Sequence, residues 1–391
     1  MTFQETKTAP PYFPARARIN LSAITHNAAN LVGRAAERNA EVMAVVKANG
    51  YGHGLVESAR AALAGGATWL GVAQSEEALE LRAAGITSRI FTWLYGPGVP
   101  FAKLIDRNVD VSVCTPWAVT ELLAAAKVAG KVPRVHLKID TGLGRNGVPP
   151  QAIDTVLAPL LEAQAQGTIE LVGIWSHLAF ADEPEHPTVL GQAQVFNQAI
   201  AHCEAAGARF EVRHIANSAA TLSNPDMFYD LVRPGIALYG LVPSPQMGTS
   251  AEFGLIPAMT LEADLVNVKV LPANHGISYG HQYRTATQTV TAVVPLGYAD
   301  GIPRSASSSE GHPGGPVQVG ALRTAVAGRV CMDQFVVDLG PDATTAAGEV
   351  VVLFGDPTTG VPSADDWALA ADTINYEITT RLGARVPRIY Q

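Results

Sequence analysis

The sequence predicts an α/β barrel, a TIM-like (β/α)8 N-terminal domain, followed by a mostly β C-terminal domain. Eight short apolar segments are spaced along the first 242 residues, and stretches rich in alanine, leucine and glutamate lie between them. Strands that are apolar throughout indicate a parallel sheet buried on both faces. Eight strand–helix units close naturally into a barrel. After residue 242 the pattern changes to β-rich segments separated by turn residues, which predicts the second domain.

The elements follow in order along the chain. The barrel domain is expected over residues 1–242, with 1–17 as an N-terminal extension, and the β-rich domain over 243–391. The expected barrel strands are 42–48, 69–73, 89–93, 109–113, 134–140, 170–177, 211–215 and 231–238. Helices are clearest at 75–84 and 116–129, where helix formers are followed by glycine. In the second domain we expect strands within 259–271, 290–295, 323–328, 334–339 and 349–354, an exposed loop over 304–316, and a helix over 364–372 capped by Ser363.

The structural competitor is a doubly wound open sheet. Gly50, Gly52 and Gly54 follow the first strand, but their spacing is not the GxGxxG pattern of a dinucleotide-binding fold, and a lysine precedes them. The barrel therefore remains the preferred prediction.

Composition restricts the class of protein. Lys and Arg total 27 and Asp and Glu total 35, giving a formal net charge of −8, and no basic run stands out, which argues against nucleic-acid or anionic-membrane partners. Three widely spaced cysteines indicate neither a disulfide framework nor a metal site. The first residues lack the apolar segment of a signal peptide, and no apolar run approaches ~18 residues. We expect a soluble, cytoplasmic protein.

Function in such a barrel is carried by residues where strands end and loops begin. Lys47 ends the first apolar strand, where a lysine can form an imine with a carbonyl compound, although a lone lysine there is more often structural. Lys138 and Arg145 lie at the end of the fifth strand with Asp140, which offers an ion pair to Lys138 as the structural alternative. His177 ends the sixth strand.

The last two barrel strands suggest a phosphate site. Asn217 or Ser218 can cap a short helix, and the loops after the seventh and eighth strands of such barrels commonly bind phosphate through backbone N–H groups. Ser218, Gly235 and Ile236 therefore form a plausible phosphate cup, with Arg233 beside it. An imine-forming lysine, a phosphate cup and an arginine together indicate pyridoxal 5′-phosphate (PLP).

Eight motifs in a fixed order identify a family resemblance. They are AVVKANGYGHG, HLKIDTGLGRNG, HIANSAA, RPGIALYG, GISYG, PLGYADG, GRVCMDQ and NYEI. From about residue 18 to residue 388 the chain resembles the alanine racemase family of fold-type III PLP enzymes. Gly50 is a local departure, because the family more often has alanine at that position.

The resemblance implies a role for each matching residue. Lys47 would hold PLP through an imine and serve as one catalytic base, and Tyr279 would be the other base on the opposite face of the substrate. Arg233 would donate to the pyridine nitrogen, and His177 would link Arg233 to Tyr279. Arg145 would contact the phenolic oxygen of PLP and, with the backbone of Met332, the substrate carboxylate. The residues expected to bind the phosphate or lie beside the cofactor are Tyr51, Asn217, Ser218, Gly235, Ile236 and Tyr376.

The resemblance also implies an assembly. In the family the tyrosine that matches Tyr279 reaches the partner's barrel, so Tyr279 and Met332 would complete the partner site of a homodimer. Tyr298 would line the entrance, and Lys138 matches a lysine that is carbamylated in some members. The implied activity is racemisation of alanine, which supplies D-alanine for bacterial peptidoglycan. The alternatives are a broad-specificity or serine-type racemase, a non-catalytic PLP-binding protein, and a PLP decarboxylase, which the Arg233 motif and GISYG do not suit.

Overall fold

A computed structural model describes residues 13–391, which divide into two compact units. One unit is Asn20–Ala258, and the other joins the described residues before Asn20 to Met259–Gln391. Each unit is described separately below. No helix within residues 13–391 has both the length and the apolar character needed to cross a membrane.

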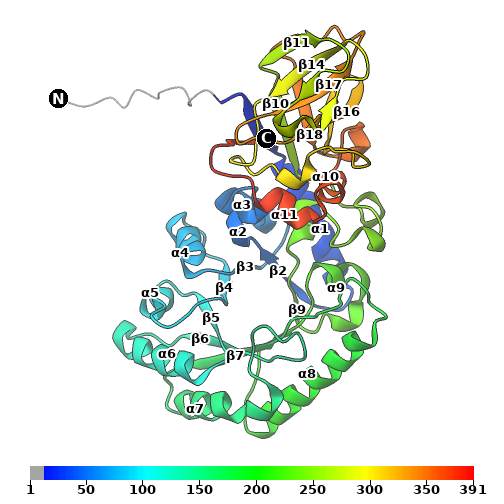
Figure 1. Ribbon diagram of the computed structural model, residues 1–391. Helices are drawn as coiled ribbons and strands as arrows, with labels where there is room; N and C mark the ends of the chain where they lie inside the picture. The colour runs from blue at the N-terminus through cyan, green and yellow to red at the C-terminus, as the bar shows by residue number, and fades with distance from the viewer. Residues whose placement is uncertain (1–12) are drawn as a thin grey trace, which may run out of the picture. The chain divides into compact units, whose positions relative to one another are not determined.

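The first unit is built on eight parallel strands in the order β8-β7-β6-β5-β4-β3-β2-β9 (Figure 1). They are β2 (Glu41–Val45), β3 (Trp69–Val72), β4 (Arg89–Thr92), β5 (Asp110–Val113), β6 (Arg134–Lys138), β7 (Glu170–Trp175), β8 (Val212–His214) and β9 (Leu231–Val232). Between the two ends of this order, the N–H of Asp230 donates to the carbonyl of Arg213 at 3.1 Å, and that of Arg233 to Ala216 at 3.0 Å. The predicted eight-stranded TIM-like sheet is confirmed.

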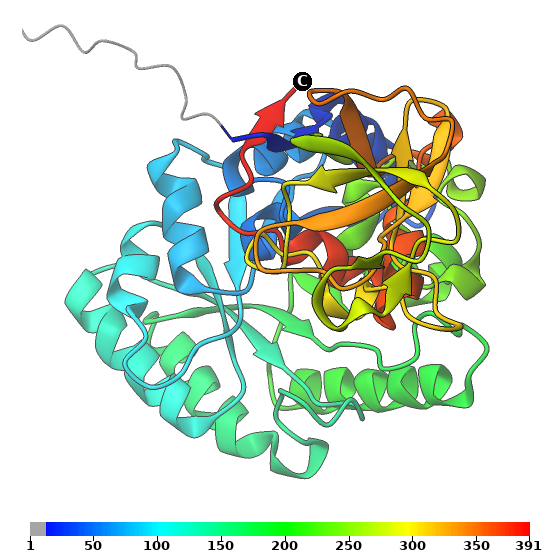
Figure 2. The same cartoon turned by 45° about the horizontal axis from the view of Figure 1, so that its top comes forward.

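Helices alternate with these strands and lie around the outside of the sheet (Figures 1 and 2). Asn20 caps the first of them by accepting the N–H of Ala23 at 3.0 Å, which fixes where the chain turns from strand to helix. The helices are α1 (Leu21–Ala36), α2 (Lys47–Tyr51), α3 (Leu55–Ala64), α4 (Ser75–Ala83), α5 (Phe101–Asp106), α6 (Pro116–Ala129), α7 (Asp154–Ala165), α8 (Pro187–Ala205) and α9 (Ser218–Ser223).

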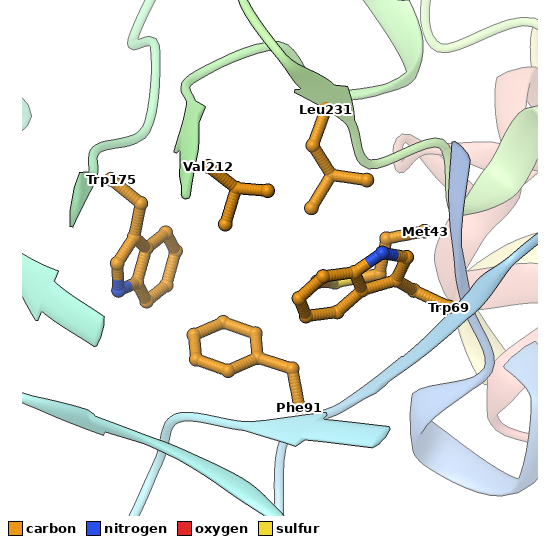
Figure 3. Packing of buried hydrophobic residues seen from close by; sticks show 6 residues of the cluster. All are labelled: Met43, Trp69, Phe91, Trp175, Val212 and Leu231. Carbon is orange, nitrogen blue, oxygen red and sulfur yellow. The ribbon is translucent and has the colours of Figure 1, made fainter. Parts of the chain in front are cut away.

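Large side chains fill the interior of the sheet. A buried cluster draws one residue from each of six strands, β2, β3, β4, β7, β8 and β9, and these side chains point toward one another (Figure 3). Its members are Met43, Trp69, Phe91, Trp175, Val212 and Leu231. The interior is therefore a packed core, and chemistry is left to the strand ends.

The second unit is mostly β, as predicted. Its six-stranded sheet has the order β16-β15-β18-β10-β1-β19, beside a three-stranded sheet β11-β14-β17 and the pair β12-β13. The strands are β1 (Ala15–Ile19), β10 (Met259–Asp264), β11 (Asn267–Leu271), β12 (Gly276–Ile277), β13 (Tyr283–Arg284), β14 (Thr289–Val294), β15 (Pro316–Val319), β16 (Leu322–Ala325), β17 (Phe335–Gly340), β18 (Val350–Phe354) and β19 (Arg388–Tyr390). Helices α10 (Ala364–Ala371) and α11 (Asn375–Thr380) follow β18, and Ser363 caps α10 as expected.

The division into units differs from the sequence-based one in two places. The predicted extension 1–17 overlaps β1, Ala15–Ile19, which pairs antiparallel with β10 and parallel with β19. This strand therefore belongs to the second unit, and residues 1–12 lie outside the described part of the chain. The boundary moves from 242 to Ala258 because the intervening segment packs on α1, where the Asn27 carboxamide accepts the N–H of Ile256 at 2.8 Å and donates to its carbonyl at 2.8 Å.

The expected exposed loop at 304–316 is only partly exposed. Ser308 is buried because its hydroxyl accepts the N–H of Gly328 at 2.7 Å, and Gly315 is buried against the ring of Trp367. Polar and glycine residues in this segment therefore pack against the rest of the second unit instead of facing solvent.

Candidate active site

Lys47 begins the turn that follows β2. The chain leaves the strand at Val45, and the next residues adopt positive φ angles: 54° at Ala48, 54° at Asn49, 61° at Gly50 and 51° at Tyr51. This left-handed turn is why the strand ends earlier than predicted. The amine of Lys47 lies 5.9 Å from the centre of the Tyr51 ring. Burial lowers the pKa of Lys47, and the charges of Arg145 and Arg233 lower it further.

Arg233 follows β9, and four acceptors lie near its guanidinium. Its guanidinium donates to the carbonyls of Ser176 at 2.8 Å and Ile215 at 3.2 Å, and it lies 3.2 Å from Nδ1 of His214 and 3.4 Å from Nδ1 of His177. Burial lowers the pKa of Arg233 to about 9, so this side chain is still a cation at neutral pH.

The two histidines beside Arg233 are neutral. Burial and the positive charge of Arg233 place the pKa of His177 and that of His214 well below the usual value of ~6.5. A neutral ring nitrogen can accept from an arginine N–H, whereas a protonated one cannot. His214 continues inward, with Nε2 3.0 Å from Nδ1 of His136. The guanidinium of Arg233 therefore donates to neutral acceptors and keeps its positive charge.

The cup predicted from β8 and β9 is assembled. The hydroxyl of Ser218, at the start of α9, accepts the N–H of Gly235 at 2.7 Å, which joins the two loops. A Cβ built on Gly235 would lie 2.2 Å from the phenolic oxygen of Tyr51, so only glycine fits beside that hydroxyl. Asn217 caps α9 by accepting the N–H of Ala220 at 3.1 Å, as its sequence context suggested. Ile236 begins the short helical turn that follows Gly235.

Lys138 is the last residue of β6, and Arg145 lies in the loop that follows this strand. Hydrogen bonds between Val148 N–H and the Lys138 carbonyl, and between Asp140 N–H and the Val148 carbonyl, both 2.9 Å, close this loop. Asp140 does not form an ion pair with Lys138; it accepts the N–H groups of Gly142 and Gly144 at 3.0 and 3.1 Å instead. The ammonium of Lys138 lies 4.2 Å from the Trp175 ring, and burial with Arg233 and Arg145 nearby lowers its pKa to about 8.

Four of the predicted site residues belong to the second unit. Tyr279, Tyr298 and Met332 are exposed there, with 70%, 43% and 54% of their surface accessible. Met332 and Tyr298 are neighbours, because the N–H of Ala299 donates to the Met332 carbonyl at 2.9 Å. Tyr376 lies on α11. The predicted residues of the barrel are therefore brought together within one unit, and the roles of these residues and of the four in the second unit remain predictions.

Sequence reasoning missed two residues of the site. His214 contacts Arg233 directly, yet it was counted only as part of the seventh strand. Glu77 accepts the N–H of Ala48, next to Lys47, at 2.6 Å, but in the sequence it is one glutamate among several on a helix. The alternation of His214 with Arg213 on β8, which directs it to the opposite face of the sheet, was the one available signal.

Comparison with known proteins gives a consistent result over the whole chain. The N-terminal domain of alanine racemase matches residues 19–243, and the C-terminal domain matches residues 258–390. Alanine racemases of Beutenbergia cavernae and Streptomyces coelicolor are 55% and 53% identical to this chain, covering 97% and 96% of it and 98% and 95% of the relatives. The crystal structure of alanine racemase from Streptomyces lavendulae, a producer of D-cycloserine, has a TM-score of 0.94 at 52% identity and covers 98% of both chains. This chain belongs to the alanine racemase family.

Proposed function

We propose that this protein is a PLP-dependent alanine racemase that interconverts L-alanine and D-alanine. One observation carries the proposal beyond family membership: Lys47, with its pKa lowered by burial, stands at the carboxyl end of a barrel strand with Arg233 and Arg145 close enough to act on its charge. An amine that is less basic than usual is more often in the neutral form that attacks a carbonyl or accepts a proton. D-Alanine for peptidoglycan is the product that this activity supplies.

The donor groups of the barrel fit PLP. A phosphate ester suits the cup made by the hydroxyls of Tyr51 and Ser218 and the backbone of Gly235 and Ile236, where the lack of a Cβ on Gly235 lets the Tyr51 hydroxyl lie against this loop. When bound, PLP supplies the electron-withdrawing ring that makes the Cα proton of an amino acid removable. Arg233 would donate to the pyridine nitrogen, and because an arginine only donates, that nitrogen stays an acceptor.

Racemisation requires a proton to leave one face of Cα and another to arrive on the opposite face, so two acid–base groups are needed. We assign Lys47 to one face and Tyr279 to the other. Arg145 would orient the substrate carboxylate with the backbone of Met332. His177 would link Arg233 to Tyr279 through hydrogen bonds, and Tyr376 would add a hydroxyl to the phosphate cup.

A homodimer is the assembly that this assignment requires. Tyr279 and Met332 are exposed in the second unit, as expected of residues that serve a partner's barrel, and Tyr298 beside Met332 would line the entrance. The high exposure of Tyr279 in its own unit supports a role across a subunit boundary.

The test is turnover of separate L-amino acids by the purified PLP-loaded protein, with chiral chromatography of the products. We expect D-alanine from L-alanine at a rate well above that of D-serine or other D-amino acids from their enantiomers. Lys47→Ala should abolish the reaction, whereas Lys103→Ala on α5 should leave it unchanged. No D-alanine from the loaded protein would refute the proposal, and faster serine turnover would identify a serine-type enzyme instead.

The two-base assignment has its own test. In heavy water, Tyr279→Phe should lose exchange of the Cα hydrogen with one alanine enantiomer and keep part of it with the other, because the Lys47 face is intact. Tyr283→Phe, which removes a hydroxyl bound to Asp338 at 2.8 Å, is the matched control and should affect both enantiomers equally. Equal loss of exchange with both enantiomers in Tyr279→Phe would contradict the assignment.

A further inference from the structure

The turn that carries Lys47 needs external support. Ala48, Asn49 and Tyr51 have φ angles of 54°, 54° and 51°, a region that side chains other than glycine occupy at a cost in free energy. Such conformations persist where neighbouring contacts over-determine them. One side chain supports this backbone directly next to Lys47.

Glu77, on the first turn of α4, is this side chain. Its Oε2 accepts the N–H groups of Ala73 and Gln74, both at 3.1 Å, which is ordinary capping of its own helix. Its Oε1 reaches a different segment and accepts the N–H of Ala48 at 2.6 Å. One carboxylate thus joins the start of α4 to the amide that directly follows Lys47.

The opposite side of Lys47 is held by the same stretch of chain. The N–H of Val46 donates to the carbonyl of Gly71, on β3, at 2.9 Å. Residue 47 therefore lies between two hydrogen bonds to the segment from β3 to α4, one made by the backbone and one by Glu77. Loss of the second would remove the side-chain hydrogen bond to the amide that directly follows the lysine.

Glu77 also opposes the cations around the lysine. Burial, Arg145 and Arg233 lower the pKa of Lys47, and the carboxylate of Glu77 is the one acidic group among the described residues that acts on that pKa in the opposite direction. The same side chain therefore affects both where the amine is and how much of it is protonated.

We propose that Glu77 is a positioning residue for the reaction: its carboxylate fixes the backbone that carries the Lys47 amine through the Ala48 amide and contributes a negative charge near that amine. The proposal rests on the proposed function for its catalytic consequence, but its structural content is independent of turnover.

The test compares Glu77→Gln, Glu77→Asp and Glu76→Gln in the full-length protein. Glutamine keeps the shape but has one acceptor oxygen and no charge; aspartate keeps the charge but is too short to span both segments. Glu76 is the neighbouring control, since within residues 13–391 its carboxylate accepts only the hydroxyl of Ser75, at 2.8 Å. Two readouts on cofactor-free protein avoid dependence on activity: hydrogen exchange of the Ala48 amide, and the pH dependence of Lys47 labelling by an amine-reactive reagent located by mass spectrometry.

We expect exchange at Ala48 to rise about ten- to a hundredfold in Glu77→Gln and Glu77→Asp, the size of a lost hydrogen bond to a charged group. The labelling midpoint of Lys47 should move to lower pH in Glu77→Gln and stay near the wild-type midpoint in Glu77→Asp. In the PLP-loaded enzymes, kcat should fall more than KM changes. Glu76→Gln should match the wild type throughout.

Wild-type exchange at Ala48 in both Glu77 variants, or a labelling midpoint in Glu77→Gln that does not move, would overturn the proposal. If glutamine prevents folding, Glu77→Asp alone decides through Ala48 exchange. Failure of the proposed function gives a different pattern: the Glu77 variants would still change exchange and labelling, while the wild-type protein would form no D-alanine.

Discussion

Substituting Gly235 by alanine tests the phosphate cup directly. The new Cβ would lie 2.2 Å from the Tyr51 hydroxyl and 2.8 Å from the ring carbon that bears it, where ordinary contact begins at 3.4 Å, so Tyr51 must retreat by about 1 Å. It has little room, since its ring packs 5.1 Å from that of Tyr239. Overpacking of this kind costs ~1–3 kcal/mol of stability. A displaced hydroxyl would also lose the bond to the phosphate that we propose for it, making PLP binding about 10- to 100-fold weaker.

The assay is a fluorescence titration of cofactor-free protein with PLP, together with thermal denaturation. Gly33→Ala on α1, where a new Cβ has nothing within 4 Å, is the control; it should leave the PLP Kd unchanged and raise stability by up to ~1 kcal/mol. Adding Tyr51→Phe to Gly235→Ala removes the closest clash, so part of the stability should return while PLP affinity stays low. A Gly235→Ala protein with wild-type Kd and wild-type Tm would refute the reasoning.

Three further predictions concern other parts of the barrel. Gly50→Ala places a Cβ 2.7 Å from the Ser58 hydroxyl at a φ of +61° and should lower stability by ~1–3 kcal/mol in urea denaturation, with partial recovery on adding Ser58→Ala; equal stability of single and double variants would count against this steric reading. Buried Asp110 pairs with Arg134, and its pKa is lowered to about 2. Its ionised form therefore contributes ~2 kcal/mol to the free energy of unfolding, a contribution that is complete above about pH 4 and is lost as the pH falls through about 2. Asp110→Asn should be less stable by at least that amount at pH 7, and a wild-type urea midpoint would contradict this. Lys138, with a pKa of about 8, is increasingly neutral as the pH rises through that value, so ¹³C-labelled bicarbonate should give a carbamate resonance at pH 8.5 that is weaker at pH 6.5; persistence of the signal in Lys138→Ala would exclude this lysine as its source.

Much of the barrel could be predicted because strands buried on both faces appear in the sequence as continuous apolar segments. The predictions failed where local backbone geometry decides. The expected strand 231–238 ends at Val232, because Pro234 and Gly235 lead into a short helical turn, Ile236–Tyr239. Strand β1 is not among the predicted strands, because its pairing partners lie more than 230 residues away in sequence.

The candidate site divides in the same way. Residues at strand ends, such as Lys47, Arg233 and Ser218, could be predicted because parallel strands bring their carboxyl ends to one side of a barrel. Glu77 and His214 could not, because their roles depend on contacts with segments that the sequence pattern does not connect. Tyr279 was predicted as a base only from the family resemblance, because the spacing of residues in its own unit does not indicate a role in a partner's site.

We propose that Lys47 is the residue that binds PLP covalently. Borohydride reduction of the purified PLP-loaded protein, followed by peptide mass spectrometry, tests this directly. We expect a pyridoxyl group on Lys47 and none in Lys47→Ala. A pyridoxyl group on another lysine, or no protein-bound group after reduction of the loaded protein, would contradict it.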